Sequence, residues 1–212
     1  MAYAVKEMFL TLQGEGAQTG RVAVFCRFSG CNLWSGRERD RATAACRFCD
    51  TDFVGVDGLN GGRFATPEAL MDQIEATWCT ERAGGHRLIV FTGGEPLLQL
   101  NKPLIDAAHE RGFEVAVESN GTVPAPEQLD WICVSPKPRS VLRQRSGNEL
   151  KFVFPQEELE PAAFESLSFD HFFLQPMDGP NQPSNLQAAI QYCLSHPQWR
   201  LSLQTHKMIG VP

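Results

Sequence analysis

Residues 22–31 read Val22-Ala-Val-Phe-Cys-Arg-Phe-Ser-Gly-Cys31, and the tetrad Cys46-Arg-Phe-Cys49 follows after a gap of fourteen residues. The apolar run at 22–28 predicts a buried strand, so Cys31 falls just beyond its C-terminal end. Three thiolates can hold three corners of a [4Fe-4S] cluster, and the iron without a protein ligand can then bind a substrate or cofactor. This stretch therefore predicts a strand that carries cysteines to an iron–sulfur site.

The rest of the chain alternates short apolar runs with stretches of helical period. The further strands are expected at 87–92, 113–118, 131–134, 150–154, 171–175 and 199–203. The helices are expected from Pro67, after the N-cap Thr66, to a stop at Gly84-Gly85, and at 97–111, 156–165 and 184–195. This βαβα order predicts a mainly parallel sheet, but periodicity does not distinguish a doubly wound sheet from an incomplete barrel.

Length and composition favour one α/β domain over residues 1–212 that binds a small molecule. The 212 residues include 19 basic and 25 acidic side chains, so no positive field favours nucleic acid or membrane as a partner. The charged N-terminus and the lack of a membrane-spanning run predict a cytoplasmic protein. Seven cysteines are an odd number, which favours reduced thiols or metal ligands over a disulfide framework.

Polar residues recur directly after the expected strands. These segments are Ser29-Gly-Cys31, Thr92-Gly-Gly-Glu95, Glu118-Ser-Asn120, Ser135-Pro-Lys137, Gln175 and Gln204-Thr-His206. The C-terminal ends of parallel strands form the edge at which α/β folds bind ligands. We therefore expect the binding site at this edge.

The cysteine pattern has two other readings, a zinc site and buried structural thiols. Structural zinc needs four protein ligands, and the nearest candidates for the fourth, Cys79 and His86, are distant in sequence. Cys26 lies in mid-strand and is expected to be a buried thiol.

The combination of motifs resembles the radical S-adenosylmethionine (SAM) enzymes. Cys31, Cys46 and Cys49, with Phe48 before the last cysteine, resemble that superfamily's CxxxCxxC motif, with an insertion at about 35–45. Gly93-Gly-Glu-Pro96 resembles its GGE motif. Within the superfamily, Phe9-Leu-Thr-Leu-Gln-Gly-Glu-Gly16, Phe25-Cys-Arg-Phe-Ser-Gly-Cys-Asn32 and Cys49-Asp-Thr51 resemble the 7-carboxy-7-deazaguanine synthase family of the queuosine pathway.

The resemblance implies a shortened, incomplete (β/α) barrel and a homodimer. It implies a lyase that contracts 6-carboxytetrahydropterin to 7-carboxy-7-deazaguanine with loss of ammonia. The cofactors would be a [4Fe-4S] cluster, SAM and Mg²⁺, and an electron donor such as flavodoxin or ferredoxin would reduce the cluster. A 5′-deoxyadenosyl radical would remove hydrogen from C6 of the pterin. No general acid or base is assigned from the sequence.

The resemblance and the residue chemistry together suggest a role for each site residue. The residues expected to bind SAM are Phe48, Asp50, Gly93, Gly94, Glu95, Glu118, Ser119, Ser135, Pro136, Lys137 and Gln175, and Thr51 is expected to bind Mg²⁺. The residues expected to contact the substrate are Leu12, Gln13, Gly14, Glu15, Arg27, Thr92, His206 and Pro212. Arg27 shares a strand face with Ala23 and Phe25, and an inward guanidinium there would suit the substrate carboxylate.

Two alternative functions remain open from the sequence. One is an enzyme of the same superfamily that makes a glycyl radical on a partner protein, and the other is a zinc-stabilised binding module. The tail Lys207-Met-Ile-Gly-Val-Pro212 is expected to have no helix and to fold across the mouth of the site. Its terminal carboxylate is then a candidate acceptor for the pterin's N–H groups.

Overall fold

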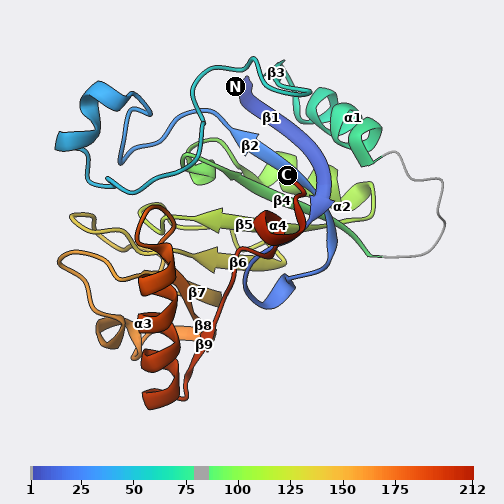
Figure 1. The fold of residues 1–212 in the computed structure, drawn as a ribbon. Coiled ribbons are helices and arrows are strands. Elements are labelled where there is room, and N and C mark those ends of the chain that lie inside the picture. Colours follow the sequence, from blue (N-terminus) through green and yellow to red (C-terminus); the bar gives the residue numbers. More distant parts are fainter. Residues whose placement is uncertain (1, 79–85) are drawn as a thin grey trace.

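The computed structural model describes residues 2–78 and 86–212. These residues form one nine-stranded sheet in the order β3-β1-β2-β4-β5-β6-β7-β8-β9. The strands are β1 (Tyr3–Leu12), β2 (Val22–Phe28), β3 (Gly62–Phe64), β4 (Arg87–Gly93), β5 (Phe113–Ser119), β6 (Trp131–Val134), β7 (Ser146–Phe154), β8 (Ser168–Pro176) and β9 (Trp199–Leu201). Because β3 and β9 are the two free edges, the curved sheet does not close, and the expected incomplete barrel is confirmed (Figure 1).

Pairing in this sheet is parallel from β2 to β9, whereas β1 runs antiparallel to β2 and β3. The parallel strands place their C-terminal ends at one edge, as the sequence predicted. Strand β1 was not predicted, and it extends the sheet on the side of the cysteine-bearing strand. It also leads directly into the segment that begins at Gln13.

Helices α1 (Pro67–Trp78) and α2 (Lys102–Glu110) cover one face of the sheet, and α3 (Gln182–Ser195) packs on β8 and β9. Leu70 and Ile74 of α1 and Leu104 of α2 are fully buried in the main apolar core. Asn101 caps the N-terminus of α2, and its side chain accepts a hydrogen bond from the backbone N–H of Leu104 at 3.2 Å. The remaining helices are the short η1 (Gly16–Gln18), η2 (Glu38–Thr43), η3 (Pro96–Leu98), η4 (Pro161–Phe164) and α4 (Thr205–Ile209).

Strand alternation gives the sheet a concave face lined by apolar residues. Ala23, Leu88, Val90 and Ala116 form this buried layer. Successive strand residues point to opposite faces, so the polar residues two positions farther along β4 and β5, including Thr92 and Glu118, share this face. This apolar layer therefore lies below the polar residues at the C-terminal ends of the strands.

Several predicted elements differ in the structure. The helix expected at 156–165 is wrong, because the segment holds only η4 after an isolated bridge between Gln156 and Leu159, and Pro161, which is tolerated at the start of η4, would break the interior of a longer α-helix. The helix expected at 97–111 is divided into η3 and α2. The expectation that the tail has no helix is also wrong, since α4 forms there. The stop expected at Gly84-Gly85 lies outside the described residues.

The insertion folds back so that the distant cysteines meet. Arg41 of η2 lies over the Trp34 ring, 4.1 Å from its centroid, and donates to the carbonyl oxygens of Arg47 at 2.8 Å and Cys49 at 3.1 Å. Trp34 in turn packs edge-on against the buried Phe53. This cation–π contact and the two hydrogen bonds fix the Cys46–Cys49 segment against the loop that follows β2.

Candidate functional site

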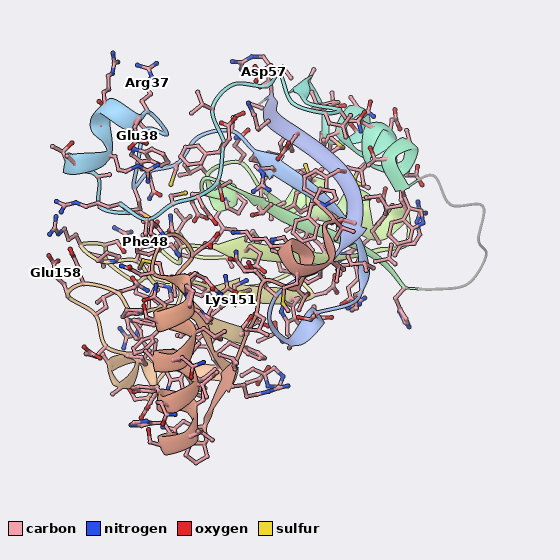
Figure 2. The ribbon with its side chains drawn as sticks, in the orientation of Figure 1. Arg37, Glu38, Phe48, Asp57, Lys151 and Glu158 are labelled. Atoms are coloured by element: carbon pink, nitrogen blue, oxygen red, sulfur yellow. The ribbon has the colours of Figure 1, made fainter. Side chains whose placement is uncertain are left out.

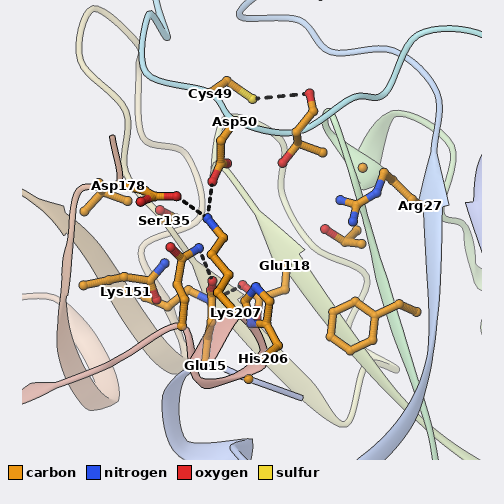
Figure 3. A pocket seen from close by; sticks show the side chains of 18 of the residues that line it. Glu15, Arg27, Cys49, Asp50, Glu118, Ser135, Lys151, Asp178, His206 and Lys207 are labelled. Carbon is orange, nitrogen blue, oxygen red and sulfur yellow. Dashed lines mark hydrogen bonds and ion pairs between the residues drawn. The ribbon is translucent and has the colours of Figure 1, made fainter. Parts of the chain in front are cut away.

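A cavity of about 670 Å³ opens at the C-terminal edge of the sheet and gathers most of the residues that the sequence singled out (Figure 3). The predicted residues on its wall are Leu12, Gln13, Gly14, Glu15, Arg27, Cys46, Phe48, Cys49, Asp50, Thr51, Thr92, Gly93, Gly94, Glu118, Ser119, Ser135, Lys137, Gln175, His206 and Pro212. Cys31, Glu95 and Pro136 lie behind this wall. The site is therefore built from loops after β1, β2, β4, β5, β6 and β8 together with the tail.

The three cysteines form one group at the cavity's edge. A hydrogen bond from Cys46 lowers the pKa of Cys49 to about 6. Cys31 packs against Gly94, where an added Cβ would lie 2.6 Å from the Cys31 Cβ, so glycine is needed for this close approach. Among the described residues, no group of three His, Cys, Asp or Glu side chains is arranged around one metal ion. In a [4Fe-4S] cluster each thiolate binds a different iron, so the three soft sulfur ligands fit a cluster better than a single ion.

The glycine turn after β4 brings backbone, not a carboxylate, to the cavity. Gly93 has φ +140° and lies so close to β2 that a Cβ would stand 2.2 Å from the Phe28 carbonyl oxygen. The Glu95 carboxylate is fully buried, and it accepts hydrogen bonds from Ser119 Oγ at 2.9 Å and from the Asn120 backbone N–H at 2.8 Å. Burial raises the pKa of Glu95. In this conformation Glu95 ties the loops after β4 and β5 together.

Arg27 points into the cavity as its strand alternation predicted (Figure 3). Its Nε donates to Glu7 Oε1 at 2.9 Å, and the side chain is 19% exposed. Glu7, a cavity residue on β1, was missed because no motif marks it. Among the described residues, Glu7 bonds the Arg27 guanidinium through Nε. The two terminal nitrogens of the guanidinium can therefore bind a second anion.

A buried ion network lies at the base of the cavity. Lys151 Nζ stands 2.7 Å from Glu15 Oε2 and 2.8 Å from Glu118 Oε2, and its side chain is only 4% exposed. Burial lowers the pKa of Lys151, but the acidic groups around it hold that pKa well above its usual range. Burial would raise the pKa of Glu15, and Lys151 together with hydrogen bonds instead brings it to about 2. Lys151 is therefore a permanent cation between two carboxylates.

Sequence reasoning missed Lys151 even though its strand was predicted. The available signal was a lysine inside the apolar run Leu150-Lys-Phe-Val-Phe154, since a charged side chain in a buried strand needs partners. The partners come from β5 and from the loop after β1. Neither contact can be read from sequence spacing.

The tail closes one side of the cavity through α4. Lys207 Nζ lies 3.0 Å from Asp50 Oδ2 and also pairs with Asp178 (Figure 3). Thr11 Oγ1 donates to the Pro212 carbonyl oxygen at 2.8 Å. Desolvation lowers the pKa of His206, so its imidazole is neutral at pH 7. The tail thus joins the segment after Cys49 to the end of β1.

A second cavity, of about 370 Å³, lies on the other side of Phe48. Phe48 and Glu158, both labelled in Figure 2, line this cavity, and the Glu158 carboxylate pairs with Arg139, a third lining residue. Gln156 lines the cavity and is 8% exposed, and its Oε1 is buried without a hydrogen-bond partner in the described structure. Sequence analysis missed Gln156 because it placed this segment in a helix.

The structure also places the other residues considered for a zinc site or a structural thiol. Cys26 is fully buried, as expected for a structural thiol, and His86 is exposed. Cys79 lies outside the described residues.

Within residues 2–78 and 86–212, every helix is too short or too polar to span a membrane.

Comparison with known proteins agrees with the motifs. The model of the radical SAM superfamily matches residues 40–136. A protein of Bordetella pertussis named 7-carboxy-7-deazaguanine synthase is 63% identical over 212 residues, which cover 100% of both chains. A protein of the same name from Burkholderia multivorans is 58% identical, again over 100% of both chains. The crystal structure of QueE from Escherichia coli has a TM-score of 0.70 at 27% identity and covers 96% of this chain and 94% of that chain.

Proposed function

The chain belongs to the 7-carboxy-7-deazaguanine synthase family of radical SAM enzymes, and we propose that it contracts 6-carboxytetrahydropterin to 7-carboxy-7-deazaguanine with loss of ammonia. One observation carries the proposal. A single cavity holds the thiols of Cys46 and Cys49, the glycine turn after β4 and a charged subsite around Arg27 and Glu15. A concave site of about 670 Å³ suits a small molecule, whereas a glycyl-radical activating enzyme must admit a protein segment.

When bound, the [4Fe-4S] cluster supplies one-electron cleavage of SAM and so hydrogen abstraction from the substrate. The thiols of Cys31, Cys46 and Cys49 hold the cluster in this proposal. Gly93 and Gly94 present backbone polar groups to the amino acid part of SAM. Ser135 and Lys137 face the cavity from the end of β6, and they contact the carboxylate and ribose of the cofactor.

The other residues proposed to bind SAM lie on or behind the same cavity wall. Phe48 separates the two cavities, and its ring supplies an apolar surface for the adenine. Glu95 holds the turn after β4 from behind, and Pro136 does the same after β6. The residues that complete this part of the site are Asp50, Glu118, Ser119 and Gln175.

The substrate lies between β1 and the tail in this proposal. Leu12, Gln13, Gly14 and Glu15 form one wall, and Glu15 carries a negative charge above pH 2 that can accept N–H groups of the pterin. Thr92 faces them across the floor. His206 and Pro212 complete the wall on the tail side.

We expect Arg27→Ala to weaken pterin binding while SAM binding stays nearly intact. The guanidinium is mostly desolvated, so losing its charge pair with the substrate carboxylate costs about 2–5 kcal/mol. Calorimetric titration of each ligand measures the effect. Val22→Ala, at the exposed start of the same strand, serves as the control. Equal losses in both affinities for Arg27→Ala would contradict the assignment.

We expect Thr51→Ala to raise the Mg²⁺ concentration needed for turnover without loss of iron. Thr51 lines the cavity beside Asp50, and a hydroxyl is an oxygen ligand that a hard cation accepts while keeping water and substrate in its shell. The measurement is a magnesium titration of product formation in both proteins. Thr51→Ser retains the hydroxyl and should retain the wild-type titration. Activity that is independent of magnesium in all three proteins would exclude the site.

We further propose a homodimer in the cytoplasm, reduced by an electron donor such as flavodoxin or ferredoxin. The thiols of the described cysteines are free, which suits a reducing compartment. Residues 37–47 hold four arginines against two acidic residues, Glu38 and Asp40, which pair with Arg41 and Arg39, and the remaining positive charge favours an acidic donor.

A further inference from the structure

The loop that carries the substrate residues Gln13 to Glu15 is held from below by two side chains that lie outside the cavity wall. Glu149 Oε2 accepts a hydrogen bond from the Ala17 backbone N–H at 2.9 Å. Ser202 Oγ accepts one from the Gly16 backbone N–H at 2.9 Å. These two bonds satisfy the consecutive backbone N–H groups of Gly16 and Ala17. Such buried donors are costly to leave unpaired.

Glu149 is an unusual residue for this position. It is 2% exposed, and burial followed by the charge of nearby Glu118 raises its pKa despite the opposing effect of Lys151. The Cys133 thiol donates to its Oε1 at 3.4 Å. A carboxylate buried at this cost, beyond the reach of substrate, needs a structural or functional reason.

The fit between Glu149 and the loop is close. Gly16 has φ +64°, and a Cβ added there would lie 1.9 Å from Glu149 Oε1. The loop therefore rests directly on the carboxylate. The residue just before this contact is Glu15, whose side chain turns the other way, to Lys151 at 2.7 Å and to the amide of Gln204 at 2.9 Å (Figure 3).

We propose that Glu149 is a positioning residue for the substrate: it fixes the backbone at Gly16 and Ala17 so that Glu15 faces the pterin. Glu149 acts through Glu15 and does not touch substrate. The inference rests on the proposed function. It adds that the contact between Glu149 and the loop sets the affinity for the pterin. Ser202 Oγ, which accepts from the Gly16 N–H, also donates to Gln175 Oε1 at 3.2 Å. It therefore connects the loop to the cofactor side of the cavity.

The first test compares Glu149→Ala with Glu149→Gln in reconstituted protein. Losing the hydrogen bond that Glu149 accepts under the loop should raise both the KM and the calorimetric Kd for 6-carboxytetrahydropterin by about tenfold to a hundredfold. The kcat and the affinity for SAM should change little. Glu149→Gln keeps an oxygen that can accept from Ala17, so it should recover most of the pterin affinity.

Asp130→Ala is the matched control. Asp130 Oδ2 accepts from the Val115 backbone N–H at 2.7 Å, a carboxylate–backbone bond at the opposite end of the sheet. Its loss should lower the Tm without changing pterin affinity. A purely structural role for Glu149 would give the same pattern as Asp130→Ala.

A second test approaches the contact from the loop. Gly16→Ala places a methyl group against the carboxylate and should also raise the pterin Kd. In the Glu149→Ala background the methyl group has space, so Gly16→Ala should then have a smaller effect than in the parent. This variant pair keeps the inference testable even if Glu149→Ala alone folds poorly.

The outcomes separate this inference from the function beneath it. Wild-type protein that forms no deazapurine overturns the proposed function. Wild-type turnover with unchanged pterin affinity in Glu149→Ala, or with additive effects of the two substitutions, overturns only the positioning role. Equal losses of pterin and SAM affinity that Gln does not rescue also overturn it.

Discussion

Replacing Cys31, Cys46 or Cys49 by Ala is expected to abolish the visible absorbance of the iron–sulfur cluster and, with it, product formation. The thiols of Cys46 and Cys49 share a hydrogen bond, and Cys31 packs on the glycine turn beside them. Each thiolate would hold a separate iron, so no neighbouring side chain can replace a lost ligand. The measurement is anaerobic reconstitution with iron and sulfide, followed by absorbance and iron analysis of each variant.

Cys193→Ala is the control for these variants, because Cys193 lies on α3, away from the cavity. It should bind the same amount of iron as the wild type. The ligand assignment is wrong if Cys31→Ala keeps the cluster while Cys193→Ala loses it. A zinc-stabilised module would instead bind zinc and give no visible absorbance.

Lys151→Met should strongly destabilise the protein and abolish pterin binding. The substitution removes the buried cation shared by the half-buried carboxylates of Glu15 and Glu118, and removing one partner of a buried charge pair typically costs about 3–5 kcal/mol. Denaturant unfolding measures the change in the free energy of unfolding. Lys102→Met removes an exposed pair with Asp106 and should cost no more than about 1 kcal/mol.

The pH dependence of Lys151→Met gives an independent check. In the wild type, the pKa of Glu15 falls from 4.5 to about 2 in the folded state. Its contribution to stability is therefore complete above about pH 4.5 and is lost as the pH falls through about 2. In Lys151→Met the unpaired carboxylate should favour its protonated form, so stability should rise on mild acidification. An unfolding free energy equal to that of the wild type at pH 7 would contradict the role of the network.

The parallel strands and the ligand-binding edge could be predicted because both depend on local patterns. The run at 22–28 is apolar, and Gly93-Gly94 follows the next parallel strand along the chain. The alternation of Ala23, Phe25 and Arg27 correctly placed the guanidinium inside the barrel. In these cases the local pattern is enough to predict the strand and the direction of its side chains, because each strand is short and buried.

Other features depend on contacts between distant segments and could not be predicted. Lys151 meets Glu15 across 136 positions, and no periodicity encodes that pairing. Strand β1 was missed because its polar residues, among them Lys6 and Glu7, obscure the apolar pattern. The return of the insertion depends on Arg41 stacking on Trp34, which spacing alone does not specify.

The most direct test of the account is anaerobic incubation of the reconstituted protein with SAM, Mg²⁺, a reductant and 6-carboxytetrahydropterin. The account predicts a deazapurine chromophore that accumulates with time and is absent for Cys49→Ala. Ammonia should be released in equal amount. A protein that carries the cluster and cleaves SAM, but forms no deazapurine from this pterin, would contradict the central claim.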